Sequence, residues 1–400
     1  MSLWATVNTG WPKMSDTGLT EAAGTFVGRV WVPGKGPVLV KLRDGALIDI
    51  TSRELPTMCD LLEAEDPAAV VAGLDGPVLV KLRNLEAESI AACGDPSRQH
   101  FLAPNDLQAV KAAGVTFASS MVERVIEERA AGDPRAARVI RDQIGALIGE
   151  SLSEIVPGSE KAEQVKTALQ QEGLWSQYLE VGIGPDAEVF SKAQTLSAVG
   201  WGAPVGLHPK SVWNNPEPEI VLAVNSTGQI KGATIGNDVN LRDFEGRSAL
   251  LLSKAKDNNA SASIGPFIRL FDDSYGIEHV RKAELTMTVV GQDGYVLTGH
   301  SSMSKISRDP TDIVAQTINE NHQYPDGFML YLGTLFAPTD DRDIAGAGFT
   351  HKIGDRVSIK ASDLGTLVND VRLSRDCPHW TFGAGALMRN LAQRGLLYVG

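Results

Sequence analysis

Residues 214–248 read NNPEPEIVLAVNSTGQIKGATIGNDVNLRDFEGRS. Two runs rich in apolar residues, 220–224 and 229–235, flank the tetrapeptide Asn-Ser-Thr-Gly at residues 225–228. Asn and Gly tolerate the positive φ that tight hairpin turns require. The stretch therefore predicts two antiparallel strands joined by a short turn.

Three carboxylates flank the predicted hairpin. Glu217 and Glu219 are separated by one residue, so on a strand they project to the same face. If the turn is centred within residues 225–228, Glu217 lies opposite Gly236. Asp238, two residues after Gly236, then lies diagonally across from Glu217 and projects to the same face of the sheet. Long side chains at such diagonal positions can reach one another. We therefore expect the three side chains to converge on one point.

Three carboxylates this close repel one another, and either protonation or a bound cation relieves the repulsion. Oxygen ligands alone favour magnesium, manganese or calcium over zinc. The alternative is an exposed hairpin whose acidic residues face water. The Glu-x-Glu pair by itself favours that alternative, whereas Asp238 and the apolar strands support a cation site.

The same residues carry a resemblance. The segments PEPEI (216–220) and GNDVNLRD (236–243), followed by a later lysine, resemble the fumarylacetoacetate hydrolase family. The spacing of nineteen residues from Glu219 to Asp238 is similar to that of its sugar-acid dehydratase branch. This family binds a magnesium-type ion through the Glu-x-Glu pair and the first Asp of NDxxxRD. The resemblance thus implies Mg²⁺ or Mn²⁺ as cofactor, with Glu217, Glu219 and Asp238 as ligands.

The resemblance also implies a fold. We expect an α+β protein in which residues 102–400 form the catalytic domain, a mixed β-sheet roll with peripheral helices. Ahead of it we expect an N-terminal arm, 1–24, and a small β-rich N-terminal domain, 25–101, in which the octet GPVLVKLR occurs at both 36–43 and 76–83. The resemblance further implies a homodimer or homotetramer.

Several helices are expected. Asn105 is suited to capping a short helix at residues 106–113. A longer helix is expected at 121–131, with its mixed charges mostly on solvated faces. A third is expected at 242–258, with Leu250 inside and Lys256 in the last turn, where a cation suits the helix dipole.

Residues 114–123 stand where the family has GxNYxxHxxE. Ser120 replaces the histidine of family hydrolases, while Glu123 matches the glutamate. Without the imidazole, C–C hydrolysis loses its general base, which favours proton transfer and elimination. Taken alone, Ser120 is more typical of a helix N-cap, and Glu123 of an acid in the first turn of a helix.

In this family the catalytic lysine follows the metal-binding Asp at a comparable distance along the chain. Lys256, eighteen residues after Asp238, is therefore the lysine that the resemblance selects. A lysine beside a desolvated site loses its proton readily, which suits a general base. The alternative is an ordinary cation at a helix end. The remaining candidates, each with an alternative as a surface or structural group, are the substrate-binding residues Thr116, Ser120, Lys192, Arg308 and Thr334.

The implied activity is metal-dependent dehydration of a small-molecule 2-keto-3-deoxy sugar acid. We expect 2-keto-3-deoxy-D-xylonate as substrate and 2,5-dioxopentanoate as product, in pentose catabolism. Lys256 is expected to act as the base and Glu123 as the acid. Two alternatives remain: an acylpyruvate or β-diketone hydrolase of the same fold, and a non-catalytic metabolite-binding protein.

Composition excludes several other classes. The net charge of −12, without a Lys/Arg cluster, disfavours nucleic-acid binding. Cys59, Cys93 and Cys377 form no CxxC pair, so neither a disulfide framework nor a zinc ribbon is indicated. There is no signal-peptide pattern and no apolar run of about 18 residues. We therefore expect a cytoplasmic protein without a membrane partner.

Overall fold

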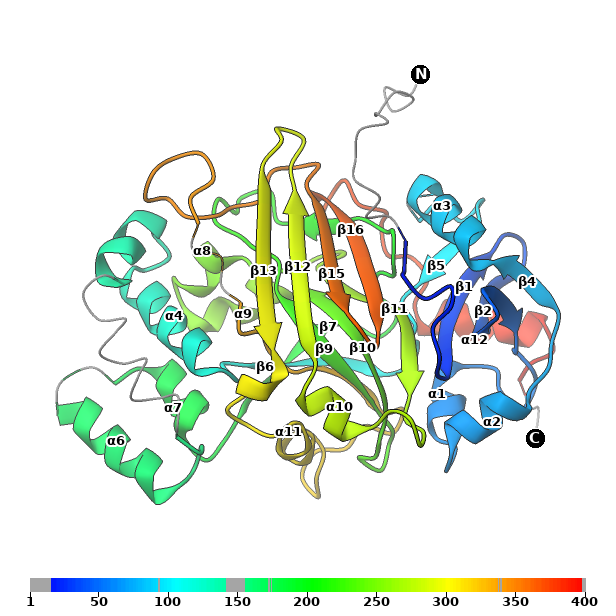
Figure 1. Ribbon diagram of the computed structural model, residues 1–400, viewed down its shortest axis with the longest axis horizontal. Coiled ribbons are helices and arrows are strands. Elements are labelled where there is room, and N and C mark those ends of the chain that lie inside the picture. Colours follow the sequence, from blue (N-terminus) through cyan, green and yellow to red (C-terminus); the bar gives the residue numbers. More distant parts are fainter. Residues whose placement is uncertain are drawn as a thin grey trace.

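The computed structural model describes residues 16–92, 94–141, 155–171, 173, 175–336, 338 and 340–397. Cys93 and the first fifteen residues of the predicted arm lie outside these ranges. Two β-sheets occupy the centre of the molecule, and helices gather at both of its ends (Figure 1). The predicted class, an α+β protein with mixed sheets, is confirmed.

The larger sheet has eleven strands. They are β1 (Phe26–Val32), β2 (Gly36–Arg43), β3 (Ala46–Asp49), β4 (Val78–Lys81), β5 (His100–Leu102), β6 (Ala109–Gly114), β7 (Glu188–Ala193), β9 (Pro218–Val224), β10 (Ile230–Asp238), β11 (Ala262–Leu270) and β14 (Phe328–Tyr331). Their order is β4-β3-β2-β1-β11-β10-β9-β14-β6-β7, and β5 pairs with β1 beside this path. The β14–β6 pair is parallel and the other pairs are antiparallel, so the sheet is mixed.

The smaller sheet has five strands, β8 (Val205–Leu207), β12 (Glu284–Val290), β13 (Val296–Ser302), β15 (Arg356–Ala361) and β16 (Gly365–Leu373). Their order is β13-β12-β15-β16-β8. Along β12, buried and more exposed residues alternate, as expected for a strand with one face on the core. Its buried residues, Leu285, Met287 and Val289, join the core cluster that includes Ile220 and Leu222 of β9. The two sheets therefore share one hydrophobic core.

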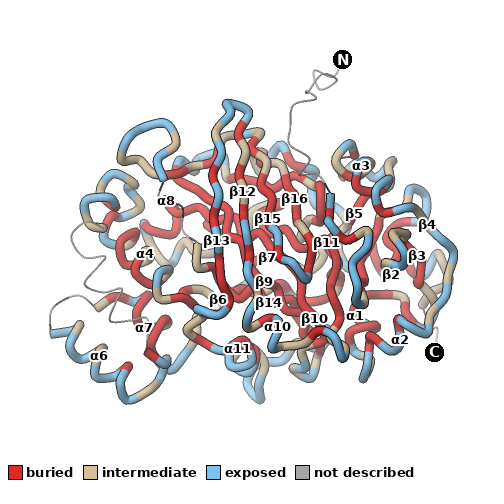
Figure 2. Tube along the Cα trace, in the orientation of Figure 1, coloured by how far each residue is buried: buried red, intermediate tan, exposed pale blue. Residues whose placement is uncertain are grey.

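Strand β9 is buried along its whole length, as the colouring of Figure 2 illustrates for the central strands. Ile220 and Leu222 belong to the core between the sheets, whereas Val221 and Ala223 belong to a second core cluster. Strands buried on both faces read as continuous apolar runs, which explains the sequence of this segment. A carboxylate at the end of β9 is consequently surrounded by protein.

The register of the β9–β10 hairpin differs from the prediction by two residues. Gly236 pairs with Glu219 and not with Glu217, because the turn is one residue longer than predicted and the ladder shifts by one residue early in β10. The total displacement of two residues preserves the facing parity, and the Asp238 amide donates to the Glu217 carbonyl at 3.0 Å.

The helices cover the two ends of the sheets. At one end lie α4, α6 and α7, and at the other lie α1, α2, α3 and α12 (Figure 1). No helix among the described residues is long and apolar enough to cross a membrane. The helices are α1 (Met58–Leu62), α2 (Pro67–Gly73), α3 (Leu82–Ala92), α4 (Ala118–Arg129), α6 (Glu160–Gln171), α7 (Gln177–Ile183), α8 (Arg242–Glu245), α9 (Leu252–Lys256), α10 (Ile277–Arg281), α11 (Pro310–Thr317) and α12 (Ala384–Gln393), with the 3₁₀ turns η1 (Ala249–Leu251) and η2 (Met303–Lys305).

The N-terminal strands extend the larger sheet, because β1 pairs with β11. The two copies of GPVLVKLR have different structures. The first forms β2, whereas the second forms the short strand β4 and enters α3 at Leu82. The division into N-terminal and catalytic domains stays a prediction.

Two helix predictions are wrong. Residues 106–113 contain strand β6, which pairs with β14 and β7. Residues 242–258 form α8, η1 and α9 in place of one helix. Gly246 caps α8, and the Ser248 hydroxyl accepts from the Leu250 amide to begin η1. Leu250, predicted to be inside, is 95% exposed.

Candidate functional site

Glu217, Glu219 and Asp238 form a buried cluster of carboxylates. Glu219 lies in β9, Glu217 immediately precedes that strand, and Asp238 ends β10. One oxygen from each residue lies within 4.8 Å of the others. The predicted convergence of the three side chains is therefore confirmed, and we refer to them as the acidic triad.

The electrostatics of the acidic triad fit a divalent cation. Burial raises the pKa of Glu219 well above its ordinary value, and the Asp238 and Glu217 carboxylates raise it further. Glu219 accepts a hydrogen bond from the Gly333 amide at 2.7 Å. Within the described part of the chain, no lysine or arginine forms an ion pair with Glu219. A cation relieves such a conflict, and three carboxylates are ligands of the magnesium type.

Lys256 lies directly against the acidic triad. Its Nζ donates to Glu217 Oε2 at 2.5 Å and to Asp238 Oδ2 at 3.1 Å. Burial lowers the pKa of Lys256, but the Asp238 and Glu217 carboxylates outweigh burial and raise it above the ordinary value. The expectation of a lysine whose pKa is lowered by its desolvated site is therefore wrong for this arrangement, because carboxylates share that site.

Lys192 lies behind the triad, fully buried in β7. Its Nζ is 2.9 Å from Asp238 Oδ1 and donates to the carbonyls of Lys256 and Val239 at 2.6 and 3.2 Å. Burial lowers the pKa of Lys192, and Asp238 opposes that shift. This position suits a lysine that balances the charge of the acidic cluster. The predicted contact with substrate does not fit, because the ammonium is enclosed by protein.

A narrow cleft, partly open to solvent, leads to the triad. Four further residues of the predicted site line it. Ser120, in the first turn of α4, donates to the Phe117 carbonyl at 2.8 Å, and Thr334 Oγ1 accepts from the Phe336 amide at 3.1 Å. The predicted residues that the cleft brings together are Glu217, Glu219, Asp238, Lys256, Glu123, Ser120 and Thr334.

Two predicted substrate-binding residues lie away from the cleft. The Thr116 hydroxyl donates to the Leu332 carbonyl at 2.7 Å and so fixes the loop before Gly333. The Arg308 guanidinium donates to the carbonyls of Val181 and Pro185 at 3.0 and 3.3 Å. Both side chains are buried in backbone contacts. Neither geometry fits substrate binding, so we withdraw both assignments.

Glu123 lines the cleft but is held by two arginines. Its carboxylate accepts from Arg141 Nε and Nη2 at 2.8 and 2.7 Å, and from Arg242 Nη2 at 3.2 Å. Both of its oxygens are thus occupied by guanidinium groups. This arrangement suits a structural ion pair better than the predicted acid that protonates a leaving group.

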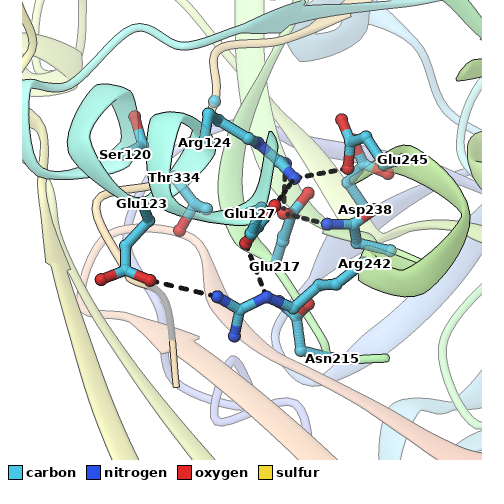
Figure 3. A network of polar contacts seen from close by, with 12 residues as sticks. Ser120, Glu123, Arg124, Glu127, Asn215, Glu217, Asp238, Arg242, Glu245 and Thr334 are labelled. Carbon is cyan, nitrogen blue, oxygen red and sulfur yellow. Dashed lines mark hydrogen bonds and ion pairs between the residues drawn. The ribbon is translucent and has the colours of Figure 1, made fainter. Parts of the chain in front are cut away.

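The sequence analysis missed Arg124. The Arg124 side chain extends from α4 to the triad, where Nη2 donates to Glu217 Oε1 at 3.1 Å (Figure 3). Its Nη1 donates to Glu127 at 2.8 Å and to Glu245 at 2.5 Å. The expectation that charges of this helix are mostly solvated is wrong for Arg124 and Glu127. Their spacing of three on one helix face was visible, but the same spacing is typical of surface ion pairs.

Glu188, at the start of β7, was also missed. It lines the cleft and is half-buried. Burial raises the pKa of Glu188 to about 7, with Glu245 adding to the shift and Arg124 opposing it. A carboxyl with a pKa near neutrality is typical of proton-transfer sites. The sequence did contain an indication of this position: Glu188, Phe190 and Lys192 are spaced by two residues, which places all three on one face of a strand.

The comparison with protein families gives one match. Residues 185–372 match the family described as fumarylacetoacetate (FAA) hydrolase, C-terminal. The chain is 30% identical over 188 residues to the 2-dehydro-3-deoxy-D-arabinonate dehydratase of Saccharolobus solfataricus, covering 47% of this chain and 59% of that protein. It is 30% identical over 194 residues to the probable 2-keto-3-deoxyxylonate dehydratase of Haloferax volcanii, covering 48% of this chain and 63% of that protein. The match therefore spans about three fifths of the length of each relative.

Solved structures share the fold. The apo form of 2-keto-3-deoxy-D-arabinonate dehydratase matches with a TM-score of 0.60 at 21% identity, over 87% of this chain and 99% of that chain. A structure of the same protein in complex with magnesium and 2,5-dioxopentanoate matches equally well. These likenesses confirm the predicted fold.

Proposed function

We propose, from the match of residues 185–372 to the fumarylacetoacetate hydrolase family, that this protein is a hydro-lyase acting on a 2-keto-3-deoxy-pentonate. The product is 2,5-dioxopentanoate. The observation that carries the proposal is the acidic triad, whose oxygens lie within 4.8 Å of one another beside Lys256. The names of the two similar dehydratases support the choice of reaction.

Glu217, Glu219 and Asp238 are the residues that would hold a Mg²⁺ ion. When bound, the ion supplies Lewis-acid polarisation of an α-keto acid, which favours loss of a proton from the neighbouring carbon. Lys192 supports this site from behind, because its ammonium lies 2.9 Å from Asp238 Oδ1 and holds that carboxylate in place.

The reaction removes a proton from C3 and the hydroxyl from C4 as water, and the unsaturated product tautomerises to the C5 aldehyde. Lys256 lies closest to the triad and is our candidate for the group that accepts the C3 proton. Because Glu217 and Asp238 are also the proposed cation ligands, the protonation of Lys256 depends on whether they hold a cation. We assign the assistance of hydroxyl departure to Glu188 in place of Glu123. The Glu188 carboxyl, whose pKa is about 7, is partly protonated at neutral pH.

The relatives' names differ in the parent sugar acid, yet the two substrates have the same stereochemistry. A ketone at C2 and a methylene at C3 leave C4 as the single stereocentre of a 2-keto-3-deoxy-pentonate. D-xylonate and D-arabinonate have the same configuration at C4, so both give one compound after dehydration at C2 and C3. We therefore propose this D compound as the substrate, and the relevant competitor is its C4 enantiomer.

An assay that couples aldehyde formation to a dehydrogenase tests the proposal. The protein, freed of metal with EDTA, is incubated with the D and L compounds and then supplied with Mg²⁺. We expect turnover of the D compound that begins only after Mg²⁺ is added. Glu219→Gln, which removes one carboxylate at nearly constant shape, is the matched inactive variant.

Two other outcomes would replace the proposal. Cleavage of an acylpyruvate without dehydration of either sugar acid would make the protein a hydrolase of the same fold. Magnesium-dependent binding of the sugar acid without turnover would make it a metabolite-binding protein. Ser120, at the position where family hydrolases have histidine, argues against the first outcome. The acidic triad with Lys256 beside it argues against the second.

A further inference from the structure

We propose that Arg124 is a positioning residue that fixes the Glu217 carboxylate for cation binding, as the inner end of an alternating series of buried acids and arginines. The proposal rests on the proposed function, because it takes Glu217 to be a cation ligand. The first observation is the direct contact, 3.1 Å, between Arg124 Nη2 and Glu217 Oε1. Asn240 Nδ2 donates to the same oxygen at 3.0 Å. Together the two donors fix the position of this oxygen.

Glu217 needs such support more than the other two members of the triad. It precedes β9 and therefore lies outside the strand that fixes Glu219. Asp238, at the end of β10, is held from behind by Lys192. Arg124 reaches Glu217 from α4, an element that is distant in sequence (Figure 3). The position of α4 thereby determines where one triad oxygen lies.

The second observation is that Arg124 is itself held by two further carboxylates. Its Nη1 donates to Glu127 at 2.8 Å and to Glu245 at 2.5 Å. Glu245 belongs to α8, so the guanidinium joins α4, α8 and the residue before β9. A planar guanidinium presents donors in several fixed directions, whereas an ammonium is a point charge on a flexible stem. Lysine could not maintain all three contacts in the same geometry.

The series continues outward from Glu127. Arg242 Nε donates to Glu127 Oε1 at 2.6 Å, and Arg242 Nη2 donates to Glu123 at 3.2 Å. Arg141, at the outer end, binds Glu123 with two hydrogen bonds. The guanidinium of Arg242 also lies 4.3 Å from the centroid of the Trp213 ring. Acids and arginines thus alternate from the triad towards the surface, and each fixes its neighbour.

Burial distinguishes this series from ordinary surface pairs. The side-chain exposure is 14% for Arg124, 3% for Glu127 and 2% for Arg242, and it rises to 28% for Arg141. Buried pairs keep a defined geometry, whereas exposed pairs are mobile and contribute little. The restraint on Glu217 therefore comes from the inner members. Disruption at Arg124 should have a larger effect on the cation site than disruption at Arg141.

The experiment measures Mn²⁺ binding by electron paramagnetic resonance in the unaltered full chain, Arg124→Lys and Glu127→Gln. Loss of an outer contact to a ligand typically weakens metal affinity about 10- to 100-fold. We expect that loss for Arg124→Lys, together with an altered spectrum of bound Mn²⁺. A smaller loss, still several-fold, is expected for Glu127→Gln, which keeps Arg124 but removes one of its restraints.

Arg342→Lys is the matched control, since Arg342 is a buried arginine that binds Asp355 and Asp293 away from the cleft. It should lower the melting temperature and leave Mn²⁺ affinity within about twofold of the unaltered chain, because it touches no triad residue. A merely structural role for Arg124 predicts the same pattern for Arg124→Lys. Unchanged affinity and an unchanged Mn²⁺ spectrum in Arg124→Lys would overturn the positioning role of Arg124 and leave the proposed function standing. Absence of Mn²⁺ binding in the unaltered chain would overturn the proposed function as well.

Discussion

Two buried carboxylates of this protein, Asp355 and Glu219, have opposite surroundings. Burial alone would raise the pKa of Asp355, but Arg342 and His351 bind it and lower that pKa. The Arg342 guanidinium donates to both Asp355 oxygens at 2.6 and 2.7 Å, and His351 Nδ1 lies at 3.0 Å. Glu219 has one backbone donor and two neighbouring carboxylates, and its pKa is raised.

The difference separates charges that stabilise a fold from charges that a site requires. Asp355 is compensated by side chains of the chain itself, so its burial serves a structural purpose. Glu219 is compensated only in part, and burying an unpaired charge costs stability. Such a cost is typical of functional sites, where a ligand completes the arrangement. Substitutions at and around the two carboxylates test this distinction.

The largest effect is expected for Glu219→Gln. Loss of one of three proposed ligands should reduce Mg²⁺-dependent turnover by about a thousandfold, since Lewis-acid stabilisation is worth several kcal/mol. The same change removes a buried like charge, so the melting temperature in EDTA should rise. Turnover and thermal unfolding, measured on one preparation, check both. A less stable protein with full turnover would contradict the assignment of Glu219 to the site.

Lys256→Met should lower turnover by about a hundredfold or more, because general acid–base groups contribute about 10²- to 10⁴-fold. Mn²⁺ affinity should be undiminished, since the change removes a cation that competes for the carboxylates. Lys254→Met alters an exposed lysine in the same helical turn and serves as the control. Equal turnover in the two variants would remove Lys256 from the mechanism.

Glu188→Gln should lower turnover by about a hundredfold. The sign of the pH dependence follows from the proposed role: an acid must be protonated, and Glu188 loses its proton as the pH rises through about 7. Turnover of the unaltered protein should therefore fall above that pH, and the variant should lack this limb. A profile unchanged by the substitution would exclude Glu188 as the acid.

The smallest effect on turnover is expected for Asp355→Asn. Breaking a buried pair by altering one partner typically costs about 3–5 kcal/mol of stability, because the other charge loses its compensation. Turnover per folded molecule should stay within about twofold, since Asp355 lies outside the cleft. Urea unfolding and a turnover assay below the transition measure the two quantities. A large loss of turnover in folded Asp355→Asn protein would contradict the purely structural role of Asp355 and hence its difference from Glu219.

The acidic triad was predictable from sequence because side chains alternate between the two faces of a strand, so an error of two residues in register leaves each side chain on its predicted face. The turn is one residue longer than predicted and the ladder shifts once in β10, and together they restore the parity that either alone would have reversed. Glu217, Glu219 and Asp238 therefore converge although the predicted pairing was displaced by two residues. The family resemblance, which implies a lysine at about this distance after Asp238, was similarly sufficient to select Lys256 beside the triad.

Features that depend on tertiary contacts were not predictable. Residues 106–113 contain helix-favouring alanines, yet β6 forms because β14 and β7 pair with it. A side chain of this segment does cap a helix, but a different one: the Asp106 carboxylate accepts hydrogen bonds from the Met58 and Cys59 amides at the start of α1. Arg124 illustrates the same limit. Its charge pattern along α4 is compatible with a surface helix, and only the contact with Glu217 reveals its position.

The most direct test of the central claim is anomalous diffraction from crystals of the full chain soaked with Mn²⁺, an ion with the ligand preferences of the proposed Mg²⁺. The account predicts an anomalous peak bounded by carboxylate oxygens of Glu217, Glu219 and Asp238, absent from Glu219→Gln crystals soaked in the same way. Soaked crystals of the unaltered chain with no peak between these residues, or with the three side chains turned apart, would contradict it.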